Sequence, residues 1–123
     1  MSGEKYPVRT ETVNYTIPVS GQGPLIDLNG MVLVAIEVPV TNLDASELSL
    51  MTNSQGDGND LIPVAYYNET AQVNLPLLAS IAPNLKQVTV FNPAYTRGLR
   101  YIAVYTDVPL PANRTIRLIL SVL

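Results

Sequence analysis

Hydrophobic and polar residues alternate over short stretches of this chain, and the alternation predicts β-strands. In residues 12–19 the side chains of Val13, Tyr15, Ile17 and Val19 share one face, as expected for a strand with one buried side. The proline near the end of this stretch cannot donate a ladder hydrogen bond, so that end is predicted to lie at a sheet edge or a bulge.

The next segments predict a β-hairpin. Residues 25–28 and 31–40 flank Asn29-Gly30, the dipeptide that best supplies the positive φ angles of a type I′ turn. Residues 31–36 are continuously apolar, which is typical of a strand covered on both faces or of one at an interface.

Further strand signals follow along the chain. Shorter strands are predicted by the patterns of residues 47–51, 61–67, 71–78, 87–91, 100–106 and 115–122. Between them we expect a loop at 52–60, a single helical turn at 80–85 and a turn at 92–98. In the last strand the apolar residues Ile116, Leu118, Leu120 and Val122 form one face. This alternation predicts that the C-terminal strand belongs to the core.

These elements together predict an all-β fold. Eight or nine short strands separated by turns, with no helix-length periodic segment, are typical of an antiparallel β-sandwich, here a single domain of the jelly-roll type. Ten prolines exclude long helices. Residues 1–9 are polar and are predicted to form an N-terminal arm, and residues 10–123 the sandwich.

Composition leaves two interpretations open. The chain is 47% hydrophobic and only 14% charged, well below the usual charged share of about a quarter. A partner could cover part of the apolar surface, or a tightly packed β-domain could need few charges. The net charge is −3, and the seven basic residues are spread along the chain. We therefore expect neither nucleic acid nor an anionic membrane as a partner.

The start of the chain is polar and does not resemble a signal peptide. The longest apolar run, residues 31–36, is too short to span a bilayer. Cysteine is absent, which favours synthesis in the cytoplasm over a disulfide-stabilised secreted domain.

The residue types present restrict the possible chemistry. The chain has no His and no Cys, so serine triads, cysteine dyads and imidazole or thiolate metal sites are excluded. Carboxylate catalysis remains, and it would need two acids facing each other across a cleft. Glu37 stands apart because it follows an apolar strand, but an outward or edge-facing charge is favoured over a catalytic role. The sequence predicts no enzyme and no cofactor.

One loop resembles a calcium-binding loop in composition only. Residues 53–60 offer the side-chain oxygens of Asp57, Asn59 and Asp60 at close spacing, but Asn68 stands where an EF-hand would place its bidentate Glu. A solvent-exposed loop is favoured, and no metal site is predicted.

Tyrosine is the dominant aromatic residue, and with arginine it is a preferred anchor of protein interfaces. The predicted partner-binding residues are Tyr66, Tyr67, Tyr95, Arg97, Arg100 and Tyr101. The alternative for any one of these tyrosines is a half-buried ring with its hydroxyl at the rim of a small sandwich.

The C-terminal quarter resembles a known family. This part of the chain consists of residues 100–105 (RYIAVY), a short proline-containing connection and a final apolar strand. It is similar to the end of the jelly-roll cement or decoration proteins of tailed bacteriophage heads. The resemblance implies a non-enzymatic virion protein that is made in the host cytoplasm and sits on the capsid surface. Such a protein bridges subunits of the major capsid protein lattice, as a homo-oligomer, and so stabilises the shell.

Two other functions are kept open. A carbohydrate-binding module or a receptor-binding tip would present two or three exposed tyrosine rings in a groove or on a face. A carboxylate enzyme would require two facing acids in a pocket.

Overall fold

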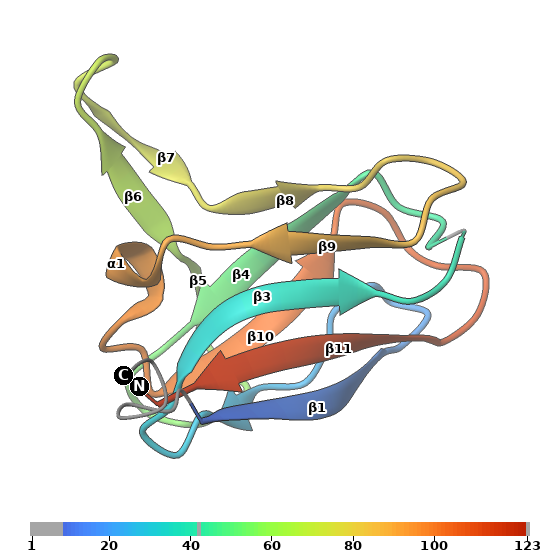
Figure 1. Cartoon of the computed structure of the whole chain (residues 1–123), viewed down its shortest axis with the longest axis horizontal. Coiled ribbons are helices and arrows are strands. Elements are labelled where there is room, and N and C mark those ends of the chain that lie inside the picture. Colours follow the sequence, from blue (N-terminus) through green and yellow to red (C-terminus); the bar gives the residue numbers. More distant parts are fainter. Residues whose placement is uncertain (1–8, 42, 123) are drawn as a thin grey trace, which may run out of the picture.

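Two antiparallel sheets face each other across a hydrophobic core in the computed structural model, which describes residues 9–41 and 43–122 (Figure 1). The first sheet has the strand order β1-β11-β3-β9. Its strands are β1 (Thr10–Ile17), β11 (Arg114–Ser121), β3 (Val32–Val38) and β9 (Gln87–Val90). Strands β11 and β3 are therefore interior, and β1 and β9 are the two edges.

The second sheet has the order β2-β10-β4-β5, and β8 also pairs with β4. Its strands are β2 (Ile26–Asp27), β10 (Tyr101–Thr106), β4 (Glu47–Thr52), β5 (Ile62–Pro63) and β8 (Leu78–Ser80). A separate two-stranded hairpin is formed by β6 (Ala65–Asn68) and β7 (Val73–Pro76). The described residues thus form the antiparallel β-sandwich that the alternating pattern predicts.

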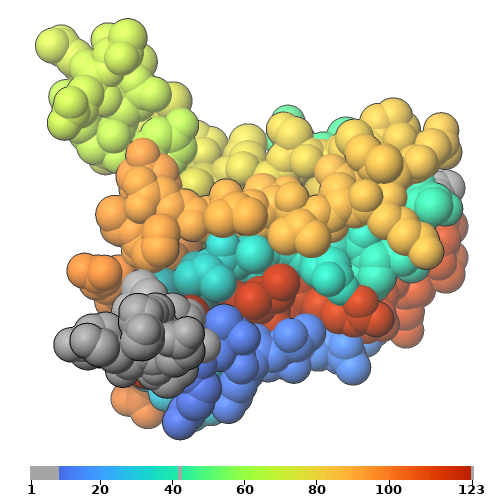
Figure 2. Space-filling view, viewed as in Figure 1, coloured from blue at the N-terminus to red at the C-terminus, as the bar shows by residue number. Residues whose placement is uncertain are grey.

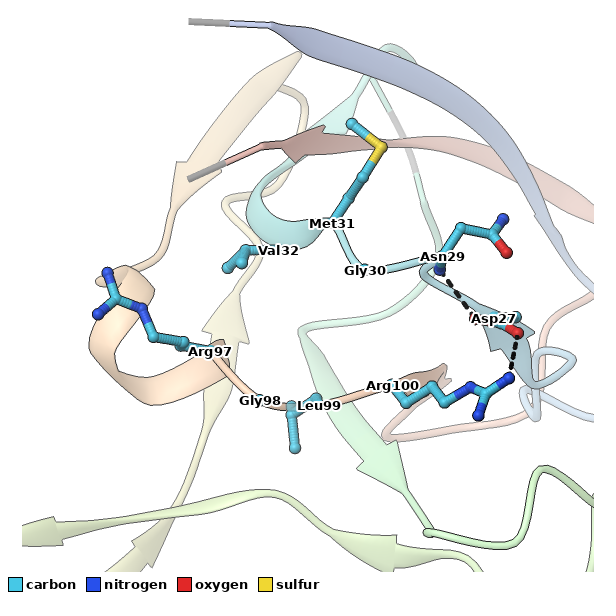
Figure 3. Close-up of a pocket in the computed structure, with 9 residues that line it drawn as sticks. All are labelled: Asp27, Asn29, Gly30, Met31, Val32, Arg97, Gly98, Leu99 and Arg100. Atoms are coloured by element: carbon cyan, nitrogen blue, oxygen red, sulfur yellow. Dashed lines mark hydrogen bonds and ion pairs between the residues drawn. The ribbon is translucent and has the colours of Figure 1, made fainter.

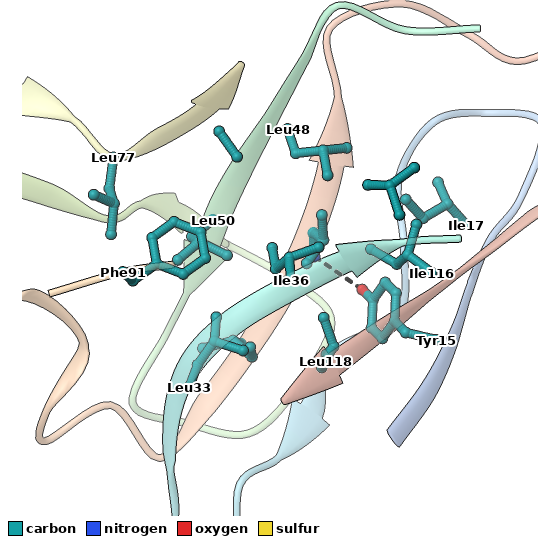
Figure 4. Close-up of a cluster of buried hydrophobic side chains, with 14 of the residues drawn as sticks. Tyr15, Ile17, Leu33, Ile36, Leu48, Leu50, Leu77, Phe91, Ile116 and Leu118 are labelled. Carbon is teal, nitrogen blue, oxygen red and sulfur yellow. Dashed lines mark hydrogen bonds between the residues drawn. The ribbon is translucent and has the colours of Figure 1, made fainter. Parts of the chain in front are cut away.

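The core lies between the inner faces of the two sheets (Figure 4). It is lined from the first sheet by Tyr15, Ile17, Leu33, Ile36, Ile116 and Leu118, and from the second by Leu48, Leu50, Ile102 and Val104. Successive residues of a strand point to opposite sides of its sheet, so every second residue enters the core. Strand β3 is the exception: Val34 is an extra residue opposite β11, so its core residues Leu33 and Ile36 are three apart. The final strand pairs with both β1 and β3, and Leu120 is 3% exposed, which confirms that this strand belongs to the core.

The apolar residues at the ends of the first and last predicted strands lie outside the core. Val19 and Val122 are 52% and 45% exposed, because β1 ends at Ile17 before Pro18 and β11 ends at Ser121. The edge position predicted from Pro18 is confirmed, since β1 is an edge strand.

The predicted hairpin at Asn29-Gly30 is wrong, although the turn itself forms. Both residues have positive φ, 53° and 79°, and the N–H of Met31 donates to the carbonyl of Leu28 at 2.9 Å. The strands on either side join different sheets, however: β2 pairs with β10, and β3 pairs with β11 and β9. The dipeptide therefore turns a corner between the sheets, because turn chemistry is local and strand pairing is not.

The helical turn predicted at 80–85 is also wrong. Strand β8 ends at Ser80, and a turn with a positive φ of 58° at Asn84 follows. The described helix is α1 (Pro93–Thr96), within the segment predicted as a turn. The Asn92 side chain accepts a 3.0 Å hydrogen bond from the N–H of Ala94, and Pro93 suits the first helical position.

Two predicted strands are each divided at a buried residue. Residues 61–67 divide at Val64 and residues 71–78 at Leu77, which are 6% and 8% exposed. The N–H of Val64 donates to Leu50 at 2.9 Å, and the N–H of Leu77 donates to Val64 at 2.8 Å. These bonds tie the base of the β6–β7 hairpin to the second sheet.

The predicted arm falls almost wholly outside the described residues. Of residues 1–9 only Arg9 is described, and its carbonyl accepts a 3.0 Å hydrogen bond from the N–H of Val122. Among the residues that are described, no helix has the length and apolar character needed to cross a bilayer.

Candidate functional site

The β6–β7 hairpin projects from one end of the sandwich (Figures 1 and 2). Its turn is organised by Asn68, whose side chain accepts a 2.8 Å hydrogen bond from Ala71 N–H and whose carbonyl accepts one of 2.7 Å from Gln72 N–H. Gln72 has the positive φ of 58° that closes the turn. In Figure 2 the hairpin stands clear of the main body, in yellow-green.

The two faces of this hairpin differ. Tyr66 pairs with Leu75 across the strands, and both are half-buried. Tyr67 pairs with Asn74 on the opposite face, and Tyr67 is 57% exposed. The hairpin therefore packs through one face and offers the other to solvent.

A series of side-chain contacts connects the hairpin to the sandwich. The rings of Tyr66 and Tyr95 are stacked, with centroids 4.8 Å apart and an interplanar angle of 25°. Tyr95 belongs to α1, and its neighbour Thr96 is fully buried and donates a 2.8 Å hydrogen bond to the carbonyl of Leu33 on β3. A two-stranded hairpin is at best marginally stable alone, so these contacts hold the hairpin in its orientation relative to the sandwich.

A pocket lies beside the stacked rings. It is lined by Tyr66, Leu75, Pro76, Leu77, Leu78 and Tyr95. Tyr95 remains 40% exposed and Leu78 38%, so the pocket has a partly apolar rim open to solvent.

A second pocket lies between the Asn29-Gly30 corner and the segment that joins α1 to β10 (Figure 3). Arg100 reaches Asp27 with 3.6 Å between guanidinium and carboxylate, and its side chain is 71% exposed. Asp27 also accepts a 2.8 Å hydrogen bond from the N–H of Asn29. Arg97 lines the same pocket, but its side chain points away from Arg100 (Figure 3). An exposed ion pair of this kind is worth little stability, so the arginines remain available to a partner.

Tyr101 lies beneath the 53–60 loop. A Cβ at Gly56 would come within 2.7 Å of the Tyr101 ring, so the loop can approach this closely only with glycine, which also has a positive φ of 77° there. The Arg100 guanidinium lies 5.1 Å from the centre of the same ring. Tyr101 is half-buried, as in the alternative interpretation of the tyrosines.

The 53–60 loop is held by its own polar groups. The side-chain amide of Asn53 donates to the carbonyls of Asp57 and Asn59, both at 2.8 Å, and its oxygen accepts from Gly56 N–H at 3.0 Å. The carboxylate of Asp57 accepts from Asn59 N–H at 3.1 Å. Within the described ranges no three acidic residues gather as a metal site would require.

Glu37 forms an ion pair with Arg117, its cross-strand neighbour on β11. Both side chains are partly exposed, at 31% and 46%. The outward charge predicted for Glu37 is found, but on an interior strand of the sheet rather than an edge. Glu37 and Asp27 line separate pockets. Among the described residues that line each pocket, that residue is the only acid, so neither pocket brings two carboxylates face to face.

The predicted partner-binding residues thus all lie at one end of the sandwich, which we call the hairpin end: β6, β7, α1 and residues 97–101. The structure brings together Tyr66 with Tyr95 and Arg100 with Tyr101, and leaves Tyr67 and Arg97 outward. The sequence patterns missed the exposed Ile62 and Val73, at 59% and 48%. Asn68 lies four residues after Val64 and is a residue type common in turns, so it could have located the turn of the hairpin that carries Val73.

Fold and site together define a small antiparallel β-sandwich with a projecting hairpin and an exposed aromatic and cationic end. A scan against protein-family models finds no match, and a search of the curated proteins finds none either. Among solved structures, the crystal structure of the SPBc2 prophage-derived protein YomS is similar. Its TM-score is 0.50 at 9% sequence identity, over 92% of this chain and 95% of that chain. At this identity the likeness shows a shared fold.

Proposed function

We propose that this chain is a non-enzymatic structural protein of a bacteriophage virion, which binds the outside of the capsid and stabilises it by bridging capsid subunits. The hairpin end is the surface proposed to contact the capsid. The observation that carries the proposal is the gathering of exposed Tyr67, Tyr95, Arg97 and Arg100 at one end of a fold shared with a prophage-derived protein.

We further propose that the sandwich is a jelly roll, the architecture of many viral capsid domains. The strand orders β1-β11-β3-β9 and β2-β10-β4-β8 support this. When β5, β6 and β7 are left out, each strand along the chain lies in the opposite sheet from the strand before it, except that β4 and β8 share a sheet. The order in which the chain visits the two sheets is therefore the same from either end. Strands β5, β6 and β7 would then be one insertion between β4 and β8, a device that adds a binding element without disturbing the core.

The chemistry of the hairpin end suits a protein partner. Tyrosine and arginine combine a large contact area with hydrogen-bonding groups and are enriched at interfaces. The exposed apolar side chains of Ile62 and Val73 enlarge the same surface. A capsid presents its binding site many times, so weak contacts of this size gain strength when several linked copies bind together.

Co-sedimentation with phage heads tests the proposal. The heads contain no DNA and are assembled from the major capsid protein encoded in the same genome. The wild-type chain should pellet with the heads. The double variant Tyr67→Ser with Arg97→Ser removes two exposed side chains and should lower the bound fraction at least about tenfold, a loss of about 1.4 kcal/mol.

The matched control is Val108→Thr. Val108 is 44% exposed and follows the far end of β10, so this change should leave binding unaltered. A wild-type chain that stays in the supernatant would contradict capsid binding. Equal pelleting of the double variant would contradict the hairpin end as the contact surface.

A carbohydrate-binding or receptor-binding role is the second candidate, because Tyr66 and Tyr95 border a pocket at the hairpin base. Their rings stack on each other, which occupies one face of each. A glycan array with wild-type chain and Tyr95→Leu separates the two functions. Glycan binding that Tyr95→Leu abolishes, without pelleting on heads, would favour the second candidate.

A further inference from the structure

Strand β9 is an edge of the first sheet, and among the described strands it pairs with β3 alone. It pairs with β3 in the register Val90 to Ala35 and Val88 to Glu37. Val88 and Val90 are 52% and 76% exposed, so the outer face of this edge strand is open to solvent.

The hydrogen bonds to β3 determine which backbone groups face outward. The N–H of Phe91 donates to the carbonyl of Val34 at 2.9 Å, and in an antiparallel ladder the bonded residues alternate. Thr89 and Phe91 therefore direct their backbone groups to β3. Val88 and Val90 direct theirs to the free edge, where each presents one N–H and one C=O.

This edge lacks the features that usually prevent strand pairing, which are charge, proline, a bulge or very short length. Its sequence, QVTV, has no charge and no proline. The other edge strands of the two sheets differ: β1 carries Glu11 and is followed by Pro18, β2 has two residues, β8 has three, and β5 contains Pro63.

We propose that β9 pairs with β9 of a second copy of this chain, antiparallel and about a two-fold axis at Thr89. Val88 then lies opposite Val90 of the second copy, and the reverse pair forms by symmetry. Each pair exchanges both of its N–H···O bonds, so all outward groups of Val88 and Val90 are satisfied. The two four-stranded sheets become one continuous sheet.

The side chains of β9 fit a second copy because Val-Thr-Val reads the same in both directions. Valine therefore meets valine on the outer face of the sheet in both pairs, a favourable β-branched combination. Lys86 would lie opposite Asn92 of the second copy, so no like charges meet. The two-fold arrangement is the commonest in homo-oligomers.

The proposed contact is small. A pair of four-residue strands buries less than the roughly 1,200 Å² of a standard stable interface, so the dimer should dissociate on dilution. It is centred on Thr89 and borders the hairpin end at Asn92, the residue that caps α1, and its existence does not depend on capsid binding.

Sedimentation equilibrium of the purified chain over a wide concentration range tests the proposal. The wild-type mass should rise from that of one chain to that of two. Val88→Pro removes an N–H that points to the free edge and leaves the bonds to β3 in place, so it should weaken dimerisation at least about tenfold. Val88→Thr keeps the N–H and should still dimerise.

A charge exchange tests the register without proline. Val88→Lys with Val90→Lys places like charges opposite each other across the axis and should give a monomer. Val88→Glu with Val90→Lys places opposite charges there and should restore the dimer. Circular dichroism checks that each variant is folded.

A wild-type chain that stays monomeric at every concentration would overturn the proposal. So would a dimer that survives both lysines in a folded variant, because the copies would then associate elsewhere. If Val88→Pro fails to fold, the comparison of the two charged variants decides the result alone.

Discussion

The phenolic oxygen of Tyr15 accepts a 2.9 Å hydrogen bond from the backbone N–H of Val104. Tyr15 lies on β1 of the first sheet and Val104 on β10 of the second, so the bond joins the two sheets through the core (Figure 4). The same hydroxyl donates to the carbonyl of Pro24 at 2.5 Å. Burial raises the pKa of this hydroxyl because the phenolate would lose its hydration. A Cβ at Gly23 would lie 2.3 Å from this oxygen, so glycine lets the 21–24 turn pack against it.

Tyr15→Phe should destabilise the fold by about 1–3 kcal/mol, because it leaves the N–H of Val104 and the carbonyl of Pro24 without their buried partner. Urea unfolding followed by circular dichroism measures the loss. Tyr67→Phe is the control, since that side chain is 57% exposed and surface changes stay within about 0.5 kcal/mol. Equal stability of Tyr15→Phe and wild type would show that the bond contributes nothing.

Deletion of residues 120–123 should prevent folding. It removes buried Leu120 and Ser121, which pair with both β1 and β3, so two strands lose their neighbour at the end of the sheet. Heteronuclear NMR spectra of the truncated chain would show collapsed amide dispersion. Val122→Thr, at a 45% exposed site, should keep native dispersion. A dispersed spectrum of the truncated chain would contradict the prediction.

Thr96→Val should loosen the hairpin end. The change keeps the volume of the side chain but removes its bond to the Leu33 carbonyl, which costs about 1–3 kcal/mol when an acceptor is left unpaired. Because Tyr95 stacks on Tyr66 from the adjacent position, amide exchange in β6 and β7 should accelerate. Thr70→Val, at the exposed hairpin turn, is the control and should leave amide exchange in β6 and β7 close to that of the wild type. Unchanged exchange in β6 and β7 would show that the stack does not depend on Thr96.

Asp107 should make stability depend on acid pH. The Ser46 hydroxyl donates to its carboxylate at 2.7 Å, and the N–H groups of Ser46 and Glu47 donate at 3.0 and 3.2 Å. These bonds, the hydroxyl first, hold the pKa of Asp107 below its ordinary 3.8.

The unfolded chain therefore takes up the proton first as the pH falls. The stabilisation is complete above pH 3.8 and is lost as the pH drops through the lower folded pKa. Asp107→Asn should lower the melting temperature at neutral pH and flatten its decline below pH 3.8. Glu69→Gln controls for the loss of one negative charge. A parallel decline of wild type and Asp107→Asn would contradict the role of these bonds.

The alternating pattern correctly predicted the buried faces of the first and last strands. Val13, Tyr15 and Ile17 face the core as the alternation predicts, as do Ile116, Leu118 and Leu120. Apolar residues such as Val90, which is 76% exposed, remain on the surface, so a partner that covers part of this surface stays a prediction.

The candidate site was predicted only in part. Tyrosine and arginine chemistry selected residues that gather at the hairpin end, but nothing local in the sequence distinguishes Tyr67, which is exposed, from Tyr101, which lies beneath Gly56. That difference depends on where the 53–60 loop lies, which is a long-range property.

By itself the sequence determined the local backbone: extended strands where side chains alternate, and a left-handed turn at Asn29-Gly30. Only the tertiary structure decided which strands pair, so the same turn joins two sheets instead of two neighbouring strands. Tyr15 and Val104 are 89 residues apart in sequence, and Thr96 and Leu33 are 63 apart. Backbone geometry is set by adjacent residues, whereas such contacts depend on how the whole core packs.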